Sequence, residues 1–227
     1  CYFYNISLKV GIEKISEIAV IFGLGKEYLK STFSSSKGII PNKVWKKNHF
    51  NTVWTKSDTI VAAIGQGYTL STPLQLAVMT SRIATEGRMV IPSILKSTSK
   101  KKNFAKNLII DEKAYKLIKT GMFKTVNNVK GTAYGSRLFN TTAYMCGKTA
   151  TSQVRRISMA EREKGIKKNE ELPREKRDHA LFAGYYPHNN PKYAFSIIVE
   201  HGGSGSKSAA PIARDLCKKL NKLYNDV

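Results

Sequence analysis

The residue types that could do chemistry gather most clearly in the run from Cys146 to Val154, where Lys148 stands beside the hydroxyl residues Thr149, Thr151 and Ser152. The run is short and rich in β-branched residues, which predicts a strand. Taken alone, a Lys-Thr pair on a strand is more often a solvated edge than a site. Whether this strand has a function must therefore be judged from motifs elsewhere in the chain.

The spacing of the cysteine and histidine residues predicts neither a metal site nor a disulfide framework. Cys1, Cys146 and Cys217 lie far apart and form no C-x-x-C pair. The histidines show no ligand spacing either. They are His49, His179, His188 and His201. We therefore expect no metal site, no cofactor and no disulfide framework.

The charge favours acidic partners without naming one. Lys and Arg total 38 against 16 Asp and Glu, which gives a net charge of +22. Such a charge draws a chain to nucleic acid, anionic lipid or an acidic polymer. The basic stretches 100–102 and 174–177 carry no interleaved aromatic residues of the kind that stack on bases, so we expect no specific nucleic-acid partner.

The first part of the chain is predicted to be mainly helical. Apolar residues from Tyr2 to about Phe22 recur at three- and four-residue steps, which predicts a helix or a broken pair of helices. The stretch from Lys30 to Asp58 is rich in Ser, Lys and Asn and predicts an irregular surface segment. Thr72 and Pro73 predict the cap and first residue of another helix.

The remaining chain is predicted to end in a sheet and a helix. A helix is expected from about Asp111 to Val126, and strands at 143–154, 180–186 and 193–200. The charged stretch from Arg155 to His179 is expected to be a surface excursion, and a last helix begins at about Ser208. This order predicts an α+β fold in which the strands pair antiparallel.

Three motifs in order resemble the class B penicillin-binding proteins. Residues 146–154 are similar to the Lys-Thr-Gly strand of penicillin-binding proteins and serine β-lactamases, and residues 62–77 to a Gly-Gln-Gly segment that leads into a helix. His201 to Gly203, followed by residues 209–213, resembles the last strand and C-terminal helix of the family. Residues 41–46, Trp54 and 178–184 resemble the elongation type, penicillin-binding protein 2.

The resemblance implies roles for the strand residues. Lys148 would offer its ammonium to a substrate carboxylate and keep the site positive, and Thr149 and Thr151 would offer hydroxyls. The backbone N–H of Thr151 would be one oxyanion donor. Ala150 stands where the family most often has Gly, and together with Ser152 it completes the expected substrate-binding strand, Lys148 to Ser152.

The resemblance also implies a nucleophile that we do not find. The family attacks with the Ser of Ser-x-x-Lys, and such matches stand here at 34–37, 93–96, 97–100 and 204–207. They are expected by chance in a chain this rich in Ser and Lys, and none opens an apolar helix. The family's second motif is Ser-x-Asn or Ser-x-Asp, and Ser-x-Asn is absent here. Tyr2 to Ile6 resembles the stretch just after that motif, so we expect the chain to lack the nucleophile segment.

Residues 1–227 are thus expected to be the C-terminal part of one transpeptidase domain, with a mainly helical part at 1–142 and strands with a terminal helix at 143–227. The implied function is a peptidoglycan D,D-transpeptidase that acts through a serine acyl-enzyme during cell elongation, inactive as this chain alone. The alternatives are a catalytically silent remnant of such an enzyme and a basic nucleic-acid-binding protein.

The implied ligands are peptidoglycan stem peptides and β-lactam antibiotics. The implied partners are a glycosyltransferase and elongation-complex membrane proteins. The implied place is the periplasmic face of the inner membrane, with an anchor outside this chain, since no run reaches the ~20 apolar residues of a membrane span.

Overall fold

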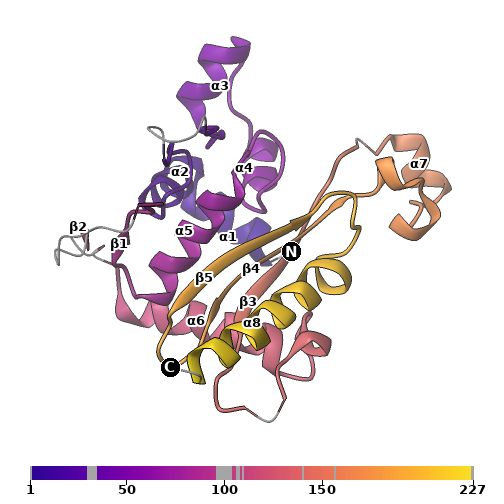
Figure 1. The fold of residues 1–227 in the computed structure, drawn as a ribbon. Coiled ribbons are helices and arrows are strands. Elements are labelled where there is room, and N and C mark those ends of the chain that lie inside the picture. The colour runs from indigo at the N-terminus through magenta and orange to yellow at the C-terminus, as the bar shows by residue number, and fades with distance from the viewer. Residues whose placement is uncertain are drawn as a thin grey trace. The chain divides into compact units, whose positions relative to one another are not determined.

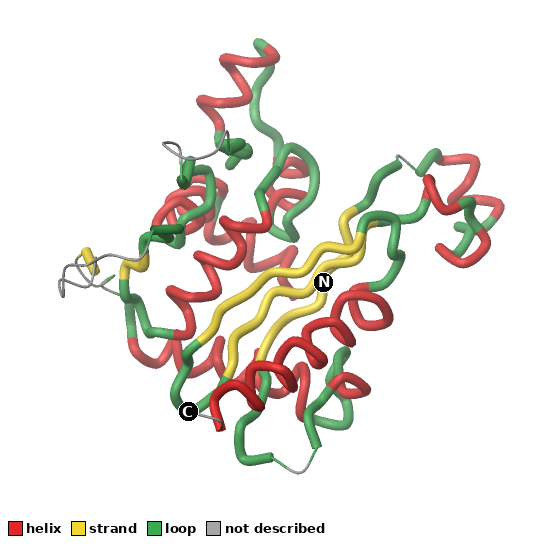
Figure 2. Tube along the Cα trace, in the orientation of Figure 1, coloured by secondary structure: helices red, strands yellow, loops and turns green. Residues whose placement is uncertain are grey.

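The computed structural model describes residues 2–29, 35–95, 104–105, 108, 110–139, 141–155 and 157–225. The chain divides into two compact units, one formed by Cys1–Arg82 with Arg88–Leu108 and the other by Ile83–Gly87 with Ile109–Val227. The first unit holds helices and a small two-stranded sheet, and the second holds a three-stranded sheet with helices (Figure 1; Figure 2). No helix in these described ranges is long and apolar enough to cross a membrane.

The N-terminal apolar stretch forms two helices, α1 (Tyr2–Val10) and α2 (Ile12–Ile21). Gly11 separates them with a φ of 78°, a left-handed conformation that glycine adopts without a Cβ penalty. The amide of Gly11 donates to the carbonyl of Ser7 at 2.8 Å, so α1 closes its last turn before the chain changes direction. Of the two predicted alternatives, the broken pair is the one that forms.

The prediction of an irregular segment from Lys30 to Asp58 is wrong for its second half. Helix α3 (Lys43–Phe50) starts after Asn42, whose side chain accepts from the Trp45 amide at 2.8 Å. Helix α4 (Lys56–Ala62) starts after Thr55, which forms a capping box with Asp58. The polar residues that resemble loop composition are the caps of two helices. Residues 30–34 of this segment lie outside the described residues.

A buried ion pair joins α3 to α4. The ammonium of Lys46 lies 2.7 Å from a carboxylate oxygen of Asp58, and the two side chains are 10% and 16% exposed. Burial alone would raise the pKa of Asp58, but hydrogen bonds from Lys46 and Thr55 outweigh it and hold that pKa below its ordinary value. The pair therefore stabilises the fold in its ionised form.

Helix α5 (Pro73–Ala84) starts as its sequence predicts. The Thr72 hydroxyl accepts from the Gln75 amide, and the Gln75 side-chain oxygen accepts from the Thr72 amide, both at 3.2 Å. Gln75 is fully buried, and its side-chain nitrogen donates to the carbonyls of Lys26 at 2.8 Å and Lys37 at 2.9 Å. One glutamine thus satisfies two loop carbonyls that would otherwise be buried without partners.

A pair of very short strands follows α5, and the sequence did not predict it. Strands β1 (Met89–Val90) and β2 (Phe104–Ala105) pair antiparallel. The buried Arg82 side chain donates to the carbonyl of Val90 at 3.3 Å and to that of Ile21 at 2.7 Å. This arginine joins the end of β1 to the end of α2.

The second unit is built on the sheet that the sequence predicts. Strands β3 (Cys146–Ser152), β4 (His179–Tyr186) and β5 (Tyr193–Val199) pair antiparallel in the order β3-β4-β5. The predicted α+β fold and neighbouring antiparallel strands are confirmed. Helix α6 (Glu112–Asn127) packs against β3 and starts where the sequence predicts, with the Asp111 side chain accepting from the Lys113 amide at 2.8 Å as its cap.

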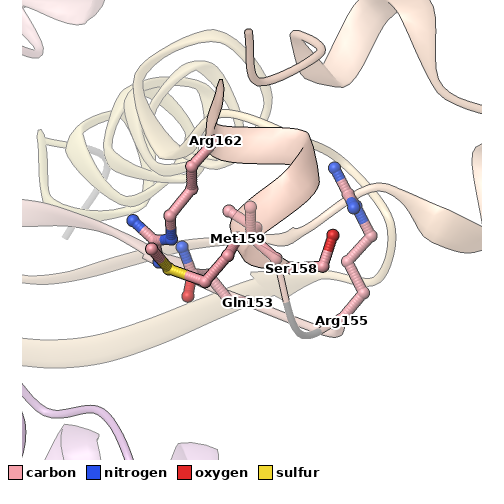
Figure 3. Close-up of a pocket in the computed structure, with 6 residues that line it drawn as sticks. Gln153, Arg155, Ser158, Met159 and Arg162 are labelled. Carbon is pink, nitrogen blue, oxygen red and sulfur yellow. The ribbon is translucent and has the colours of Figure 1, made fainter. Parts of the chain in front are cut away.

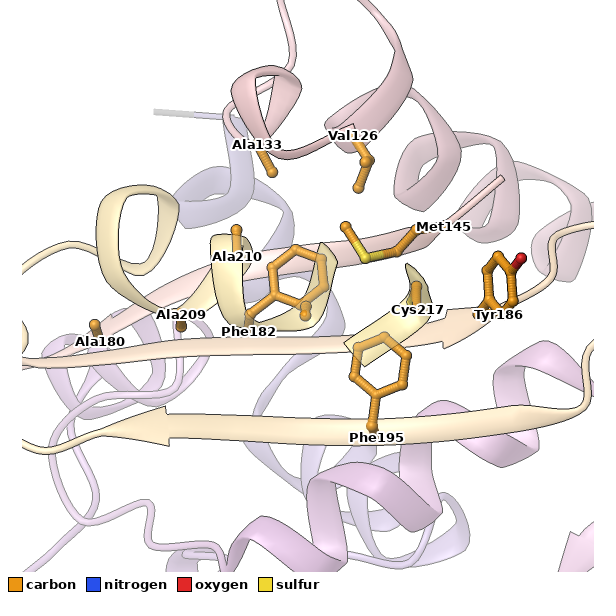
Figure 4. Close-up of a cluster of buried hydrophobic side chains, with 11 residues drawn as sticks. Val126, Ala133, Met145, Ala180, Phe182, Tyr186, Phe195, Ala209, Ala210 and Cys217 are labelled. Atoms are coloured by element: carbon orange, nitrogen blue, oxygen red, sulfur yellow. The ribbon is translucent and has the colours of Figure 1, made fainter. Parts of the chain in front are cut away.

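The core of this unit lies between the sheet and helix α8 (Ala210–Asn225), which follows a π-helical turn, η4 (Gly205–Ala209). Small residues of η4 and α8 let the helix approach the aromatic rings of the sheet (Figure 4). The Tyr186 hydroxyl donates to Asn221 at 2.8 Å, which satisfies the polar end of a buried ring. The cluster comprises Val126, Ala133, Met145, Ala180, Phe182, Tyr186, Phe195, Ala209, Ala210, Ala213 and Cys217.

The predicted surface excursion between β3 and β4 contains helical structure that the sequence analysis missed. It holds α7 (Met159–Lys164) and the 3-10 turns η2 (Asn169–Glu171) and η3 (Arg174–Lys176). Ser158 and Glu161 form the capping box of α7. None of these elements contains a buried residue, in agreement with a position at the surface.

Candidate active site

Strand β3 is an edge of the described three-stranded sheet, and it carries every strand residue that the sequence singled out. An edge strand presents unpaired N–H and C=O groups, so it can pair with an extended ligand. Gly147 lets β3 lie close to β4, because a methyl group there would overlap the Phe182 ring and lie 2.7 Å from the Ala183 carbonyl oxygen. The strand is therefore held closely against β4, and no strand among the described residues pairs with its other edge.

Strand alternation divides the candidate residues between two faces. Thr149 lies opposite Phe182, whose ring is in the core under α8, so Thr149 and Thr151 share that face. Lys148, Ala150 and Ser152 belong to the opposite face. The structure brings all five residues to one strand edge but not to one face.

Lys148 makes no ion pair among the residues that the structure describes. Its ammonium donates to the carbonyl of Thr149 at 2.8 Å, which turns the head of the side chain back to its own strand. The residue as a whole is exposed, yet partial desolvation of the ammonium lowers the pKa of Lys148. A ligand carboxylate at this position would gain an unneutralised cation.

Thr149 has a partner that sequence reasoning missed. Its hydroxyl lies 2.9 Å from the hydroxyl of Thr132, which follows α6. The two residues are 17 positions apart, and only the packing of α6 against β3 brings them together. The contact can fix the direction in which the Thr149 hydroxyl points.

The methyl group of Ala150 does not enter the core. Ala150 is exposed and lies on the face of Lys148. Its backbone is approached by Gly205 of η4, where an added methyl group would lie 2.5 Å from the Ala150 carbonyl oxygen. The Ala150 backbone thus packs against Gly205, while the Ala150 methyl group is exposed and can meet a ligand.

The Ser-x-x-Lys match at 204–207 does not have the geometry of a nucleophile and its base. The Ser204 hydroxyl pairs with that of Ser206 at 2.9 Å, and the Lys207 ammonium pairs with Glu170 at 2.8 Å. Each of the other matches includes a residue outside the described ranges, namely Ser34, Lys96, and Ser97 to Lys100.

A second group of reactive residue types lies just before the motif, but its environment makes it inert. The Cys146 sulfur lies 3.3 Å from the Nδ1 atom of His188, and the Tyr185 hydroxyl lies 3.2 Å from the same atom. Burial raises the pKa of Cys146 to about 12, so the thiol stays protonated. Burial lowers the pKa of His188, and Lys119 lowers it further. The group is therefore a hydrogen-bonded part of the core beneath β3.

The chain is similar to known proteins over nearly its whole length. The family model of the penicillin binding protein transpeptidase domain matches residues 1–218. The peptidoglycan D,D-transpeptidase MrdA of Haemophilus influenzae is 33% identical over 226 residues, which cover 94% of this chain and 33% of that protein. The protein of the same name from Escherichia coli K12 is 30% identical over 213 residues, which cover 90% of this chain and 33% of that protein.

Solved structures give the same result. The complex of penicillin-binding protein 2 with MreC from Helicobacter pylori matches with a TM-score of 0.81 at 30% identity, covering 98% of this chain and 38% of that one. Penicillin-binding protein 2 of Pseudomonas aeruginosa in complex with WCK 5153 matches with a TM-score of 0.77 at 30% identity, covering 94% of this chain and 43% of that one.

The chain belongs to the penicillin binding protein transpeptidase domain family. Within that family, the relatives and structures reported above, at 30% to 33% identity, are of penicillin-binding protein 2, the elongation type to which the sequence motifs pointed. The chain spans about a third of the length of the curated relatives that it matches.

Proposed function

We propose that this chain supplies the substrate-binding strand of a peptidoglycan D,D-transpeptidase that works through a serine acyl-enzyme. The observation that carries the proposal is β3 itself, an edge strand on which one family motif holds both Thr151 and Lys148, whose ammonium makes no ion pair among the described residues. Residues 1–227 would form the C-terminal part of one transpeptidase domain.

In the proposed site Lys148 and Thr151 bind the terminal carboxylate of a stem peptide that ends in D-alanyl-D-alanine. The Lys148 ammonium exchanges its bond to the Thr149 carbonyl for a charge-assisted bond to the ligand. Thr132 orients the hydroxyl of Thr149 on the face opposite Lys148, so the carboxylate would lie at the free edge of the strand, where groups from both faces can reach it. Ala150 and Ser152 line the path of the peptide backbone.

The proposed reaction is an acyl transfer. A serine hydroxyl loses its proton to a lysine amine and attacks the carbonyl carbon of the penultimate residue, and the terminal D-alanine leaves with a proton. The N–H of Thr151 donates to the oxygen that becomes negative in the tetrahedral intermediate. An amine of a second stem peptide then takes the acyl group and regenerates the serine. A β-lactam would acylate the same serine.

The proposed setting follows from the relatives. A Helicobacter pylori relative was solved in complex with MreC, and another similar structure is described as a peptidoglycan synthase complex, with a TM-score of 0.68 at 26% identity. We infer that this protein acts beside a glycosyltransferase and other elongation-complex proteins at the periplasmic face of the inner membrane. Its basic charge of +22 would favour anionic surroundings there.

The test is the second-order rate of labelling by a fluorescent penicillin, measured on the longest form of the protein that its gene encodes. Lys148→Ala should slow labelling about tenfold to a hundredfold, the effect of one charge-assisted contact of ~1.5 to 3 kcal/mol. Lys192→Ala is the matched control, because Lys192 is an exposed lysine in the turn between β4 and β5. Equal rates for wild type and Lys148→Ala would overturn the proposed role of β3.

A further inference from the structure

The start of β3 is held by a cluster of titratable side chains that the proposed reaction does not use. The Cys146 sulfur lies 3.3 Å from the Nδ1 atom of His188, and the Tyr185 hydroxyl lies 3.2 Å from the same atom. Cys146 and Tyr185 have 0% exposure, and His188 is half-buried. One imidazole nitrogen therefore joins the first residue of β3 to β4.

The backbone and the ring of His188 both contact the chain around the start of β3. The His188 amide donates to the carbonyl of Tyr144 at 2.9 Å. Its ring packs on Phe123 of α6, with 4.9 Å between the ring centroids, and Phe123 contacts the Tyr144 ring at 5.4 Å. Cys146 and Lys148 are two positions apart on one strand, so their side chains lie on the same face. The geometry thus links His188 to the lysine that is proposed to bind the substrate carboxylate.

The neighbours of His188 determine which of its ring nitrogens carries a proton. Burial raises the pKa of Tyr185 and that of Cys146, so both side chains keep their protons at neutral pH. Both side chains are therefore donors, and Nδ1 of His188 is the acceptor between them. The imidazole must then be neutral, with its proton on Nε2. A second proton on Nδ1 would put a donor against these two donors.

The surroundings of the ring also disfavour a positive charge on it. The titratable groups around His188 are Cys146 on β3, Tyr185 on β4 and Lys119 on α6, and Glu86 in the turn after α5 pairs with Lys119 at 2.6 Å. Burial lowers the pKa of His188 most, and the positive charge of Lys119 lowers it further. An imidazolium is therefore less stable here than in water.

Acid pH works against the contact between His188 and β3. Because the pKa of His188 is lowered in the folded protein, the folded state binds fewer protons than a state in which the ring is exposed. Its contribution to stability is present above the ordinary pKa of histidine, about 6.5, and is lost as the pH falls through the lowered value.

We propose that His188 is a positioning residue that holds Lys148 in place at neutral pH and releases the start of β3 in acid. It acts through Cys146 and touches neither the substrate nor the reacting atoms. This role rests on the proposed function, because it assumes that Lys148 binds the substrate carboxylate. The reaction would then slow in acid for a reason separate from the titration of the lysine that activates the nucleophile.

The test compares wild type with His188→Asn by the rate of penicillin labelling, on the longest form of the protein that its gene encodes. The rates are measured at about pH 7.5 and about pH 5.5, on either side of the ordinary pKa of histidine. Asparagine keeps an acceptor near the position of Nδ1 but does not titrate. The ratio of wild-type to variant rates removes the pH dependence of the nucleophile and its base, which both proteins share. We expect this ratio to fall about threefold to tenfold at the lower pH, since a displaced binding group slows a reaction.

Two further variants separate this link from general effects of pH. His49→Asn is the matched control, because His49 is an exposed histidine on α3 in the other unit, and its ratio should be the same at both pH values. Cys146→Ala removes the atom through which His188 reaches β3. Its labelling should therefore lose the same acid sensitivity as that of His188→Asn, and it supplies the comparison if His188→Asn does not fold.

Amide hydrogen exchange of residues 147–149 reports on the strand without any acylation. At the lower pH these amides should exchange several-fold faster in wild type than in His188→Asn, relative to the same comparison at the higher pH. A ratio of labelling rates that does not change with pH would overturn the proposal, and so would a ratio of exchange rates that does not change. Absence of labelling at both pH values, together with pH-dependent exchange, would overturn the proposed enzyme and leave the link between His188 and β3 standing.

Discussion

Replacing Gly147 by alanine tests the close approach between β3 and β4 on which the position of Lys148 depends. The added methyl group would overlap the Phe182 ring and lie 2.7 Å from the Ala183 carbonyl oxygen. Phe182 has 0% exposure and packs in the core against α8, so the ring cannot withdraw without opening that contact. Overpacking of this kind costs about 1 to 3 kcal/mol, and we expect the upper end.

A gain partly offsets this cost, because alanine is better than glycine in a strand by about 0.5 to 1 kcal/mol. The net loss in free energy of unfolding should therefore be about 2 kcal/mol. Gly121→Ala in α6 is the matched control, since nothing lies within 4 Å of the position of its added methyl group. The same chemical change should stabilise there by about 0.5 to 1 kcal/mol.

The assay is urea unfolding followed by far-UV circular dichroism. Both tryptophans, Trp45 and Trp54, lie outside the unit that carries Gly147, so their fluorescence would report on the wrong unit. A shift of the midpoint at constant slope measures the change in stability. A Gly147→Ala protein as stable as the wild type, or a loss of equal size in Gly121→Ala, would refute the packing argument.

Three further results are expected. Ala150→Gly should change stability by at most about 1 kcal/mol while changing the rate of penicillin labelling more than that, and equal labelling rates would show that the methyl group does not face the ligand. Asp58→Asn should lose about 1.5 to 3 kcal/mol at neutral pH by weakening its bonds to Lys46 and Thr55. Because the pKa of Asp58 is lowered in the folded protein, its contribution to the free energy of unfolding is present above about pH 4 and is lost as the pH falls further. The difference in free energy of unfolding between wild type and Asp58→Asn, measured by chemical unfolding, should therefore become smaller below about pH 4. Cys146 and Cys217, with pKa values raised to about 12 by burial, should resist alkylation at neutral pH until urea unfolds the chain, and fast alkylation of the native protein would contradict their burial.

The sheet could be predicted from sequence because its signals are local. Short β-branched and aromatic runs, with strong turn residues from Pro187 to Pro191, mark β4 and β5, and their order implies antiparallel pairing. The start of α5 was equally local, since Thr72 and Pro73 are adjacent. In each case the residues that determine the local backbone conformation lie within a few positions of one another in the sequence.

The helices and strands that the sequence did not predict depend on side-chain contacts that cannot be inferred from amino-acid composition. The composition around Asn42 and Thr55 predicts a loop, yet each residue caps a helix. The Lys46–Asp58 ion pair joins these two helices. Strands β1 and β2 are two residues long each, too short for any periodicity to show. The capping box of Ser158 and Glu161 was visible in the sequence, but the high charge of the excursion concealed it.

The candidate site was predicted as a strand but not as an arrangement. The motif from Lys148 to Ser152 placed five residues in order, whereas the partner of Thr149 is a threonine 17 residues away. A pocket at the end of β3 is lined by residues between 153 and 162 (Figure 3). It forms only when the excursion after β3 folds, so residue spacing in the sequence does not predict it. The catalytic roles of the strand residues stay predictions until rates are measured.

The most direct test of the central claim is to map the residue that penicillin acylates. The longest form of the protein that the gene encodes is labelled, digested, and analysed by mass spectrometry for the peptide that carries the adduct. We expect one adduct, on the serine of a Ser-x-x-Lys motif that opens an apolar helix, and no adduct within residues 1–227. An adduct on Ser34, Ser93, Ser97 or Ser204, or stoichiometric labelling of the 227-residue chain by itself, would contradict the account.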